Sequence, residues 1–386
     1  MDIRIARGRA LIDGLFEDAT IDVNSADGAI VDLGREGKAK CLLDARGLLV
    51  LPGIVDIHGD AFERQMMPRP GVDFALDIAL LESDRQAVAN GITTVFHGVT
   101  WSWEPGLRGP ENARSLLETI EQLRPQLGAD TRFHLRHETY NLDAEQDIIA
   151  WLGDRRIDVL AFNDHMALTE QASTRPHKLA GMVDRSGVSR DQFLARVADV
   201  KKRADDVPAS IERLASTAVA NGIPLLSHHD TSPDQRRWFR TLGCRLAEFP
   251  TTLETAKAAA FAGDDIILGA PNVVRGGSHT GWINAADMIA QDLCSILASD
   301  YYYPAPLLAA FRLASDKIVM LEKAWTLVSQ TPAAAVGMND RGTITSGRRA
   351  DLIVVDARDQ RRPRVVATIA AGQIVHLTDA TRLTSA

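Results

Sequence analysis

The residues best suited to chemistry lie at the end of an apolar run in the segment PGIVDIHGDAFERQMMPRPG, residues 52–71. The run, from Gly53 to Ile57, is typical of a short buried strand, and His58 and Asp60 stand at its end. Alternate side chains of a strand share a face, so these two point the same way, about 7 Å apart. The pair is either half of a metal site or a buried histidine held by an aspartate, and ligands from elsewhere decide between them.

Eight short apolar runs in the middle of the chain predict the strands that would position such a site. They alternate with helical patterns, and this rhythm is typical of an α/β fold, a (β/α)8 TIM-type barrel. The active face of such a barrel lies at the C-terminal ends of its strands, and His, Asp, Glu or Asn ends or follows seven of the eight runs. The predicted strands are 53–60, 92–98, 132–138, 159–165, 224–230, 246–250, 265–272 and 294–300.

The polar residues at these strand ends would meet at one mouth. Six of them supply three imidazoles and three carboxylates: His58, Asp60, Glu138, His165, His228 and Asp300. This set suits one or two divalent zinc-like ions, with manganese or iron left open. Bound ions lower the pKa of water, and Asp300 is the base expected to take the proton from the attacking water. His228 and His229 are adjacent, so strand alternation predicts that only one faces the mouth. The expected metal ligands are His58, Asp60, Glu138, His165 and His228.

Two segments with arginine could bind an anion beside this site. FERQMMPRPG follows the first predicted strand, and APNVVRGGSHTG follows the seventh. Glycines let backbone N–H groups approach an anion, and arginine binds phosphate oxygens with two donors. Each segment alone is more often an ordinary loop, but a place at the rim of a metal site favours a phosphate ester or anhydride as substrate. The expected substrate-binding residues are Arg64, Arg69, Asn272, Arg275, Ser278 and His279.

The composition is that of an ordinary soluble globular protein. The 386 residues are 45% hydrophobic and 24% charged, and the net charge of −8 argues against nucleic acid as a partner. The three separated cysteines favour a reducing compartment, and no apolar run is long enough for a membrane span. We therefore expect a cytoplasmic protein with no membrane partner, while a homo-oligomer stays open.

Both ends of the chain differ from the middle. Residues 1–51 and 331–386 contain short alternating segments separated by turns with Gly and Asp. We expect these ends to pack together as one small β-sandwich next to a barrel formed by residues 52–330.

Several long motifs resemble those of the amidohydrolase superfamily. PGIVDIHGD entering the barrel, LASD on the last strand and the closing GTITSGRRADLIVVD carry this likeness. DIHGDAFERQMMPRPGV, LRHE, FNDH, SHHDT, AEFPTT, GAPNVVRGGSH and LASDYYYPAPLL are similar to the PhnM-type branch of phosphonate metabolism, from about residue 50 onward. That branch hydrolyses α-D-ribose 1-methylphosphonate 5-triphosphate to the 5-phosphate and pyrophosphate, within the carbon–phosphorus lyase pathway.

The resemblance implies a role for each matching residue. His58 and Asp60 match the metal pair of the first strand, and Asp300 matches the acid or base of the last strand. Glu138 matches a bridging or metal-binding carboxylate that replaces the modified lysine of many relatives. The two later metal-binding histidines are matched by His165 and His228.

Three departures from the family pattern affect these assignments. His229 stands where this branch is expected to have an aspartate, which leaves open whether His228 or His229 faces the metal. The tyrosines 301–303 lengthen the expected LASDYxP pattern by one residue. The later histidines fall on the fourth and fifth predicted strands rather than the usual fifth and sixth, through a missed strand or a branch-specific topology.

The candidate site predicts a metal-dependent hydrolase. The resemblance implies that its substrate is a small phosphorylated sugar, a ribose 5-triphosphate, in which a metal-bound hydroxide attacks the α-phosphorus and pyrophosphate leaves. Two alternatives stay open. One is an amidohydrolase that acts on an amide or cyclic amide with the same centre, and the loss of Arg64 or Arg275 would then harm amide turnover little. The other is a non-catalytic metal-binding partner in a phosphonate-degrading complex, in which Asp300→Asn would have no activity to remove.

Overall fold

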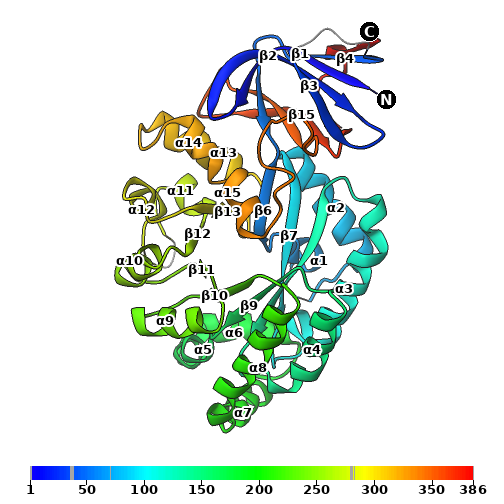
Figure 1. Ribbon diagram of the computed structural model, residues 1–386. Helices are drawn as coiled ribbons and strands as arrows, with labels where there is room; N and C mark the ends of the chain where they lie inside the picture. The colour runs from blue at the N-terminus through cyan, green and yellow to red at the C-terminus, as the bar shows by residue number, and fades with distance from the viewer. Residues whose placement is uncertain (1, 35–38, 70, 279–280, 282, 386) are drawn as a thin grey trace.

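Two sheets organise this protein, whose computed structural model describes residues 2–34, 39–69, 71–278, 281 and 283–385 (Figure 1). One sheet has eight parallel strands, and its strand order follows the sequence order. All eight predicted strands are present, and the barrel sheet has eight strands among the described residues. His228 ends the fifth strand, and His165 follows the fourth by two positions. The strands are β6 (Ile54–Gly59), β7 (Ile92–Trp101), β8 (Asp130–Glu138), β9 (Val159–Asn163), β10 (Leu225–His228), β11 (Leu246–Glu248), β12 (Asp265–Gly269) and β13 (Ile296–Ala298).

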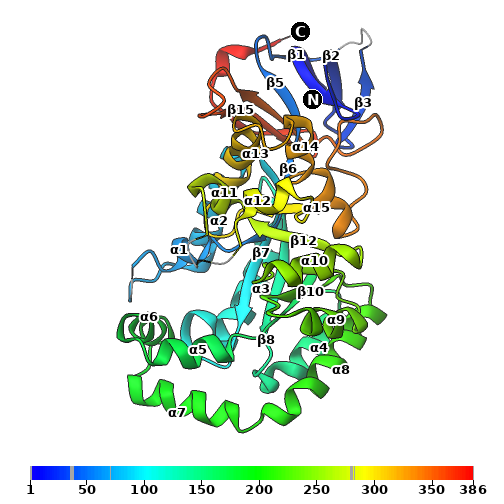
Figure 2. The ribbon, with the colours of Figure 1, turned by 90° about the vertical axis from the view of Figure 1, so that its left-hand side faces the viewer.

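Helices follow the strands and cover the outside of the sheet, which gives the predicted (β/α)8 barrel (Figures 1 and 2). A representative case is α3 (Pro110–Leu123), which begins with proline and buries Leu116, Leu117 and Ile120 at helical spacing against the barrel. The other helices are α1 (Glu63–Met66), α2 (Leu76–Ala89), α4 (Glu145–Gly153), α5 (Met166–Ser173), α6 (Pro176–Ser186), α7 (Arg190–Lys201), α8 (Val207–Ala220), α9 (Pro233–Thr241), α10 (Leu253–Phe261), α11 (Ala270–Arg275), α12 (Ala285–Ala290), α13 (Ala305–Ser315), α14 (Leu321–Thr326) and α15 (Gln330–Ala335).

The barrel is closed where its first strand meets its last. Asp300 donates its backbone N–H to His58 O at 3.0 Å, and Asp60 donates its own to Asp300 O at 3.0 Å. Beside this seam, Asp56 accepts hydrogen bonds from the backbone N–H of Ser299 at 2.9 Å and from its hydroxyl at 2.5 Å. Closure therefore brings residue 300 next to residues 58 and 60, although it lies about 240 positions further along the sequence.

Alternation along the strands separates an apolar floor from a polar mouth. The inward side chains of the lower barrel form one buried cluster, so the polar residues further along each strand must lie above it. Ala333 of α15 belongs to the same cluster and packs at the floor. The buried members are Val55, Ile57, Phe96, Val159, Ala161, Leu226, Leu246, Ile267, Ile296, Ala298 and Ala333.

The second sheet is built from both ends of the chain, as predicted. Its central contact is antiparallel pairing of β5 (Leu49–Pro52) with β14 (Leu352–Asp356), which joins the two terminal regions directly. The domain limits at residues 51 and 330 stay a prediction, and α15 packs with the barrel. The remaining strands are β1 (Ile3–Ile12), β2 (Leu15–Asn24), β3 (Ala29–Leu33), β4 (Cys41–Asp44), β15 (Arg364–Ala370), β16 (Gln373–Leu377) and β17 (Leu383–Ser385).

None of the helices in the described ranges combines the length and apolar character needed to cross a membrane. The cytoplasmic location and the oligomeric state stay predictions.

Candidate active site at the barrel mouth

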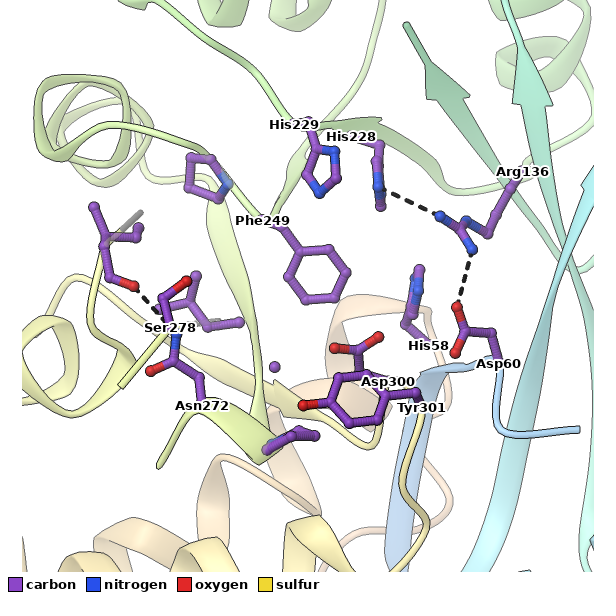
Figure 3. A pocket seen from close by; sticks show the side chains of 15 residues that line it. His58, Asp60, Arg136, His228, His229, Phe249, Asn272, Ser278, Asp300 and Tyr301 are labelled. Carbon is purple, nitrogen blue, oxygen red and sulfur yellow. Dashed lines mark hydrogen bonds and ion pairs between the residues drawn. The ribbon is translucent and has the colours of Figure 1, made fainter. Parts of the chain in front are cut away.

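A cavity of about 230 Å³ opens at the C-terminal ends of the barrel strands (Figure 3). It combines two carboxylates, three imidazoles and one guanidinium with a few apolar walls. The lining residues are His58, Asp60, Arg136, His228, His229, Phe249, Pro250, Leu268, Gly269, Pro271, Asn272, Ser278, Ile283, Asp300 and Tyr301.

Glu248 holds two of the predicted metal ligands through hydrogen bonds. Its Oε1 lies 2.7 Å from Nδ1 of His58, and its Oε2 lies 2.6 Å from Nδ1 of His228. The two imidazole rings are nearly parallel, with an interplanar angle of 16°. Since a carboxylate accepts, each Nδ1 carries the proton and each Nε2 keeps its lone pair. Burial, together with the charge of Arg136, lowers the pKa of His58 to about 3, so its ring is neutral.

Asp300 lies beside His58 and Asp60 at the closing seam. A ligand atom of each of these three residues lies within 4.8 Å of the others. Burial, and next the charge of Asp60, raise the pKa of Asp300 to about 8. A proton is therefore held at this carboxyl near neutral pH until a positive charge arrives between the carboxylates.

A second set of imidazoles lies on the far side of Arg136. Nδ1 of His165 is 2.6 Å from Glu138 Oε1, and Nε2 of His165 is 3.0 Å from Nδ1 of His229. Ligand atoms of His165, His228 and His229 lie within 4.8 Å of one another. The prediction that only one of the adjacent histidines faces the mouth is wrong, because β10 ends at His228 and His229 turns to a φ of 61°, which breaks the alternation.

His134 lies on the face of β8 that also carries Arg136 and Glu138, because alternate side chains of a strand share a face. Its Nδ1 is 3.0 Å from Ile57 O, and its buried Nε2 has no hydrogen-bond partner among the described residues. Because the carbonyl can only accept, Nδ1 carries the proton and Nε2 presents a lone pair. Together with His58 and Glu248 it forms a third group of ligand atoms within 4.8 Å.

This donor set fits a divalent ion. Neutral imidazoles and carboxylates are the ligands that zinc and similar ions take, and Glu248 orients two of the rings from behind. Within the described residues, none of the three groups of ligand atoms includes Glu138, whose carboxylate contacts His165 instead. Its assignment as a metal ligand stays a prediction, as do those of His58, Asp60, His165 and His228.

Some of the predicted substrate-binding residues line the cavity, and others lie outside it. Asn272 and Ser278 line the cavity on the side opposite Asp60 and Arg136 (Figure 3). Arg64 is exposed and donates to the backbone oxygen of Tyr301, a lining residue.

The other two arginines lie elsewhere. Arg69 and Arg275 are exposed, and neither lines the cavity in the described part of the chain. His279 lies outside the described residues. Their roles in substrate binding stay predictions.

Two residues with evident contacts were not assigned a role from the sequence. Arg136 lines the cavity, and its spacing of two from both His134 and Glu138 was the available signal. Glu248 is completely buried at a strand end, where its type and place were visible but its two histidine partners were not.

Comparisons with known proteins agree with this architecture. Residues 75–376 match the profile described as the amidohydrolase family. The chain is 33% identical over 326 residues to alpha-D-ribose 1-methylphosphonate 5-triphosphate diphosphatase of Escherichia coli (strain K12), covering 82% of this chain and 85% of that protein. It is also 35% identical over 100 residues to a dihydroorotase of Citrifermentans bemidjiense, covering 25% of this chain and 21% of that protein.

Solved structures show the same fold at low sequence identity. Dihydropyrimidinase from Brevibacillus agri NCHU1002 superposes with a TM-score of 0.62 at 12% identity, over 98% of this chain and 95% of its own. Molinate hydrolase superposes with a TM-score of 0.64 at 16% identity, over 97% and 94%. With the profile match, the eight-stranded barrel and the similarity to the diphosphatase, the chain belongs to the amidohydrolase family and is a hydrolytic enzyme.

Proposed function

We propose that this enzyme hydrolyses α-D-ribose 1-methylphosphonate 5-triphosphate to the 5-phosphate and pyrophosphate. The similarity to the Escherichia coli diphosphatase, over 85% of that protein, carries the proposal. The cavity supports it, because imidazoles and carboxylates suited to a divalent ion stand opposite amide and hydroxyl groups that can bind phosphate oxygens.

The proposed ion site comprises His58, Asp60 and Asp300, which form one group of ligand atoms. The further predicted ligands His165 and His228 belong to a separate group with His229. A bound divalent ion lowers the pKa of water and offsets negative charge on phosphoryl oxygens. Zinc is our first choice, and manganese and iron suit the same ligand types.

The protein's own groups supply positioning and proton transfer. Asp300 is the proposed base that accepts the proton of the attacking water. Arg136, Asn272 and Ser278 are the proposed ligands of phosphate oxygens, and Arg64 stands at the rim beside Tyr301. The Asn272 amide would use its second N–H, because Nδ2 already donates to Ile283 O and Oδ1 accepts from Ala285 N. Phe249 and Pro250 form an apolar wall that limits access of other water.

The test is turnover of the triphosphate in water enriched in oxygen-18, with protein reconstituted separately with zinc, manganese and iron. Attack at the α-phosphorus places the heavy oxygen in the ribose 5-phosphate product and none in pyrophosphate. No pyrophosphate release with any of the three ions would contradict the proposal. Heavy oxygen in pyrophosphate would show attack at the β-phosphorus instead.

Hydrolysis of a cyclic amide is the second candidate, favoured by the local 35% identity to a dihydroorotase. Arg64→Ala separates the two, because a rim guanidinium matters for a substrate with several negative charges and little for a neutral ring. Equal losses of triphosphate and cyclic-amide turnover in Arg64→Ala would show that Arg64 does not distinguish the two substrates. A non-catalytic role predicts that Asp300→Asn has no turnover to abolish.

A further inference from the structure

Arg136 stands inside the proposed metal centre. Its Nη1 donates to Asp60 Oδ2 at 3.2 Å, and its Nη2 lies 3.5 Å from Nε2 of His228 (Figure 3). The residue is only 6% exposed. A Cβ added to Gly98 would lie 3.1 Å from Arg136 Cδ, so the stem packs closely against the backbone of β7. The guanidinium is therefore part of the buried barrel interior rather than a rim side chain.

Arg136 contacts members of two of the three groups of ligand atoms, and these two groups differ in charge. On one side are His58, Asp60 and Asp300, with two carboxylates that can neutralise a divalent ion. On the other side are three imidazoles, His165, His228 and His229, which bring no negative charge. Two carboxylates contact this group, Glu138 on Nδ1 of His165 and Glu248 on Nδ1 of His228, and each lies on the ring nitrogen opposite Nε2.

A metal ion on the imidazole side would meet the guanidinium directly. Nδ1 of His228 is committed to Glu248, so an ion can bind this ring only through Nε2. A zinc–nitrogen bond is about 2.0–2.1 Å long, which places the ion close to Arg136 Nη2. Two like charges at such a distance in a buried site repel strongly, and no carboxylate of that group compensates.

We propose that Arg136 takes the place of a second metal ion, so that the centre binds one divalent ion at His58, Asp60 and Asp300. The guanidinium supplies the second positive charge of the mouth and excludes a metal ion from His165, His228 and His229. The imidazole side then serves to bind or orient substrate oxygens. This inference rests on the metal dependence of the proposed function, but not on the identity of the substrate.

The experiment counts manganese ions per chain after metal-free enzyme is incubated with excess Mn²⁺ and passed through a desalting column. Elemental analysis gives the count, and electron paramagnetic resonance distinguishes isolated Mn²⁺ from a spin-coupled pair. Native enzyme should hold one isolated ion. Arg136→Lys, which keeps a cation, should also hold one, whereas Arg136→Met should rise to two ions with a coupled spectrum.

Substitutions in the two ligand groups test the same idea if Arg136→Met fails to fold. In otherwise native enzyme, His229→Ala should leave one bound ion, and Asp300→Asn should lose it. Two ions in native enzyme, or one ion that disappears in His229→Ala but persists in Asp300→Asn, would overturn the inference. So would a folded Arg136→Met with a single ion.

The outcome also separates this inference from the proposed reaction. One ion without pyrophosphate release would support the role of Arg136 and refute the substrate. Two ions with pyrophosphate release would refute the role of Arg136 and support the substrate. An enzyme that binds no divalent ion would refute both.

Discussion

Oε1 of Glu248 accepts a hydrogen bond from Nδ1 of His58 at 2.7 Å, between residues that are 190 positions apart in the sequence. The other oxygen of the same carboxylate holds His228, so one buried group orients two rings across the barrel. Removal of a carboxylate behind a metal-binding histidine lowers metal affinity by roughly 10- to 100-fold in proteins.

Glu248→Gln should therefore weaken metal binding by about 10- to 100-fold with the fold retained. The amide can accept from one ring only, and its NH₂ group faces the N–H of the other. Competition with a chelator of known affinity measures the change, and Glu254→Gln, an exposed glutamate on α10, is the control. Unchanged metal affinity in Glu248→Gln would mean that neither ring binds the ion.

Substitution of the two exposed arginines should change the KM for the triphosphate to different extents. Arg64 contacts Tyr301 at the cavity, whereas Arg275 does not line the cavity in the described residues. Charge-assisted hydrogen bonds to phosphate are strong, but exposure to water weakens them. We expect Arg64→Ala to raise KM roughly 10-fold and Arg275→Ala less than about 2-fold, with smaller differences at high salt. Equal effects in steady-state kinetics would place Arg275 at the substrate as well.

The seam of the barrel should be sensitive to a single methyl group. A Cβ on Gly59 would lie 2.7 Å from Asp56 Oδ2 and 3.2 Å from Ser299 Oγ, so Gly59→Ala must displace the contacts that close the barrel. Overpacking of this kind costs about 1–3 kcal/mol in the free energy of unfolding, measured with urea. Gly153→Ala at the end of α4, with no atom within 4 Å of the added Cβ, should be neutral or slightly stabilising.

Acid should weaken the contact between the barrel and the C-terminal region. Arg341 Nη1 donates to Asp130 Oδ2 at 2.7 Å, and Arg132 Nε donates to Asp130 Oδ1 at 2.8 Å. Burial alone would raise the pKa of Asp130, but the hydrogen bonds and charges of both arginines lower it from 3.8 to about 2. An aspartate whose pKa is lowered on folding stabilises the folded state above about pH 4, and this stabilisation is lost as the pH falls from about 4 to 2.

Asp130→Asn should thus lose about 2 kcal/mol at neutral pH and show a flatter stability profile between pH 4 and 2. Urea unfolding at a series of pH values measures both quantities. Asp205→Asn, at an exposed turn before α8, should reproduce the native profile. A native protein whose stability is constant over this range would show that the Asp130 contacts contribute nothing.

Local patterns in the sequence were sufficient to predict the architecture of this protein. Strand and helix rhythms extend over a few residues, and the convergence of strand ends follows from any barrel of this type. That is why all eight strands, the joining of the two chain ends and the face that carries His58, Asp60 and Asp300 could be predicted.

The connections within the site were decided only by the tertiary structure. Three contacts join residues from different strands or the segments that follow them. They are the hydrogen bond between Glu248 and His58, the contacts of Arg136 with Asp60 and His228, and the hydrogen bond between Glu138 and His165. The turn at His229, which directs both adjacent histidines to the cavity, departs from strand alternation. Such contacts depend on strand register, barrel closure and side-chain reach across the interior, which a single sequence does not encode as a local pattern.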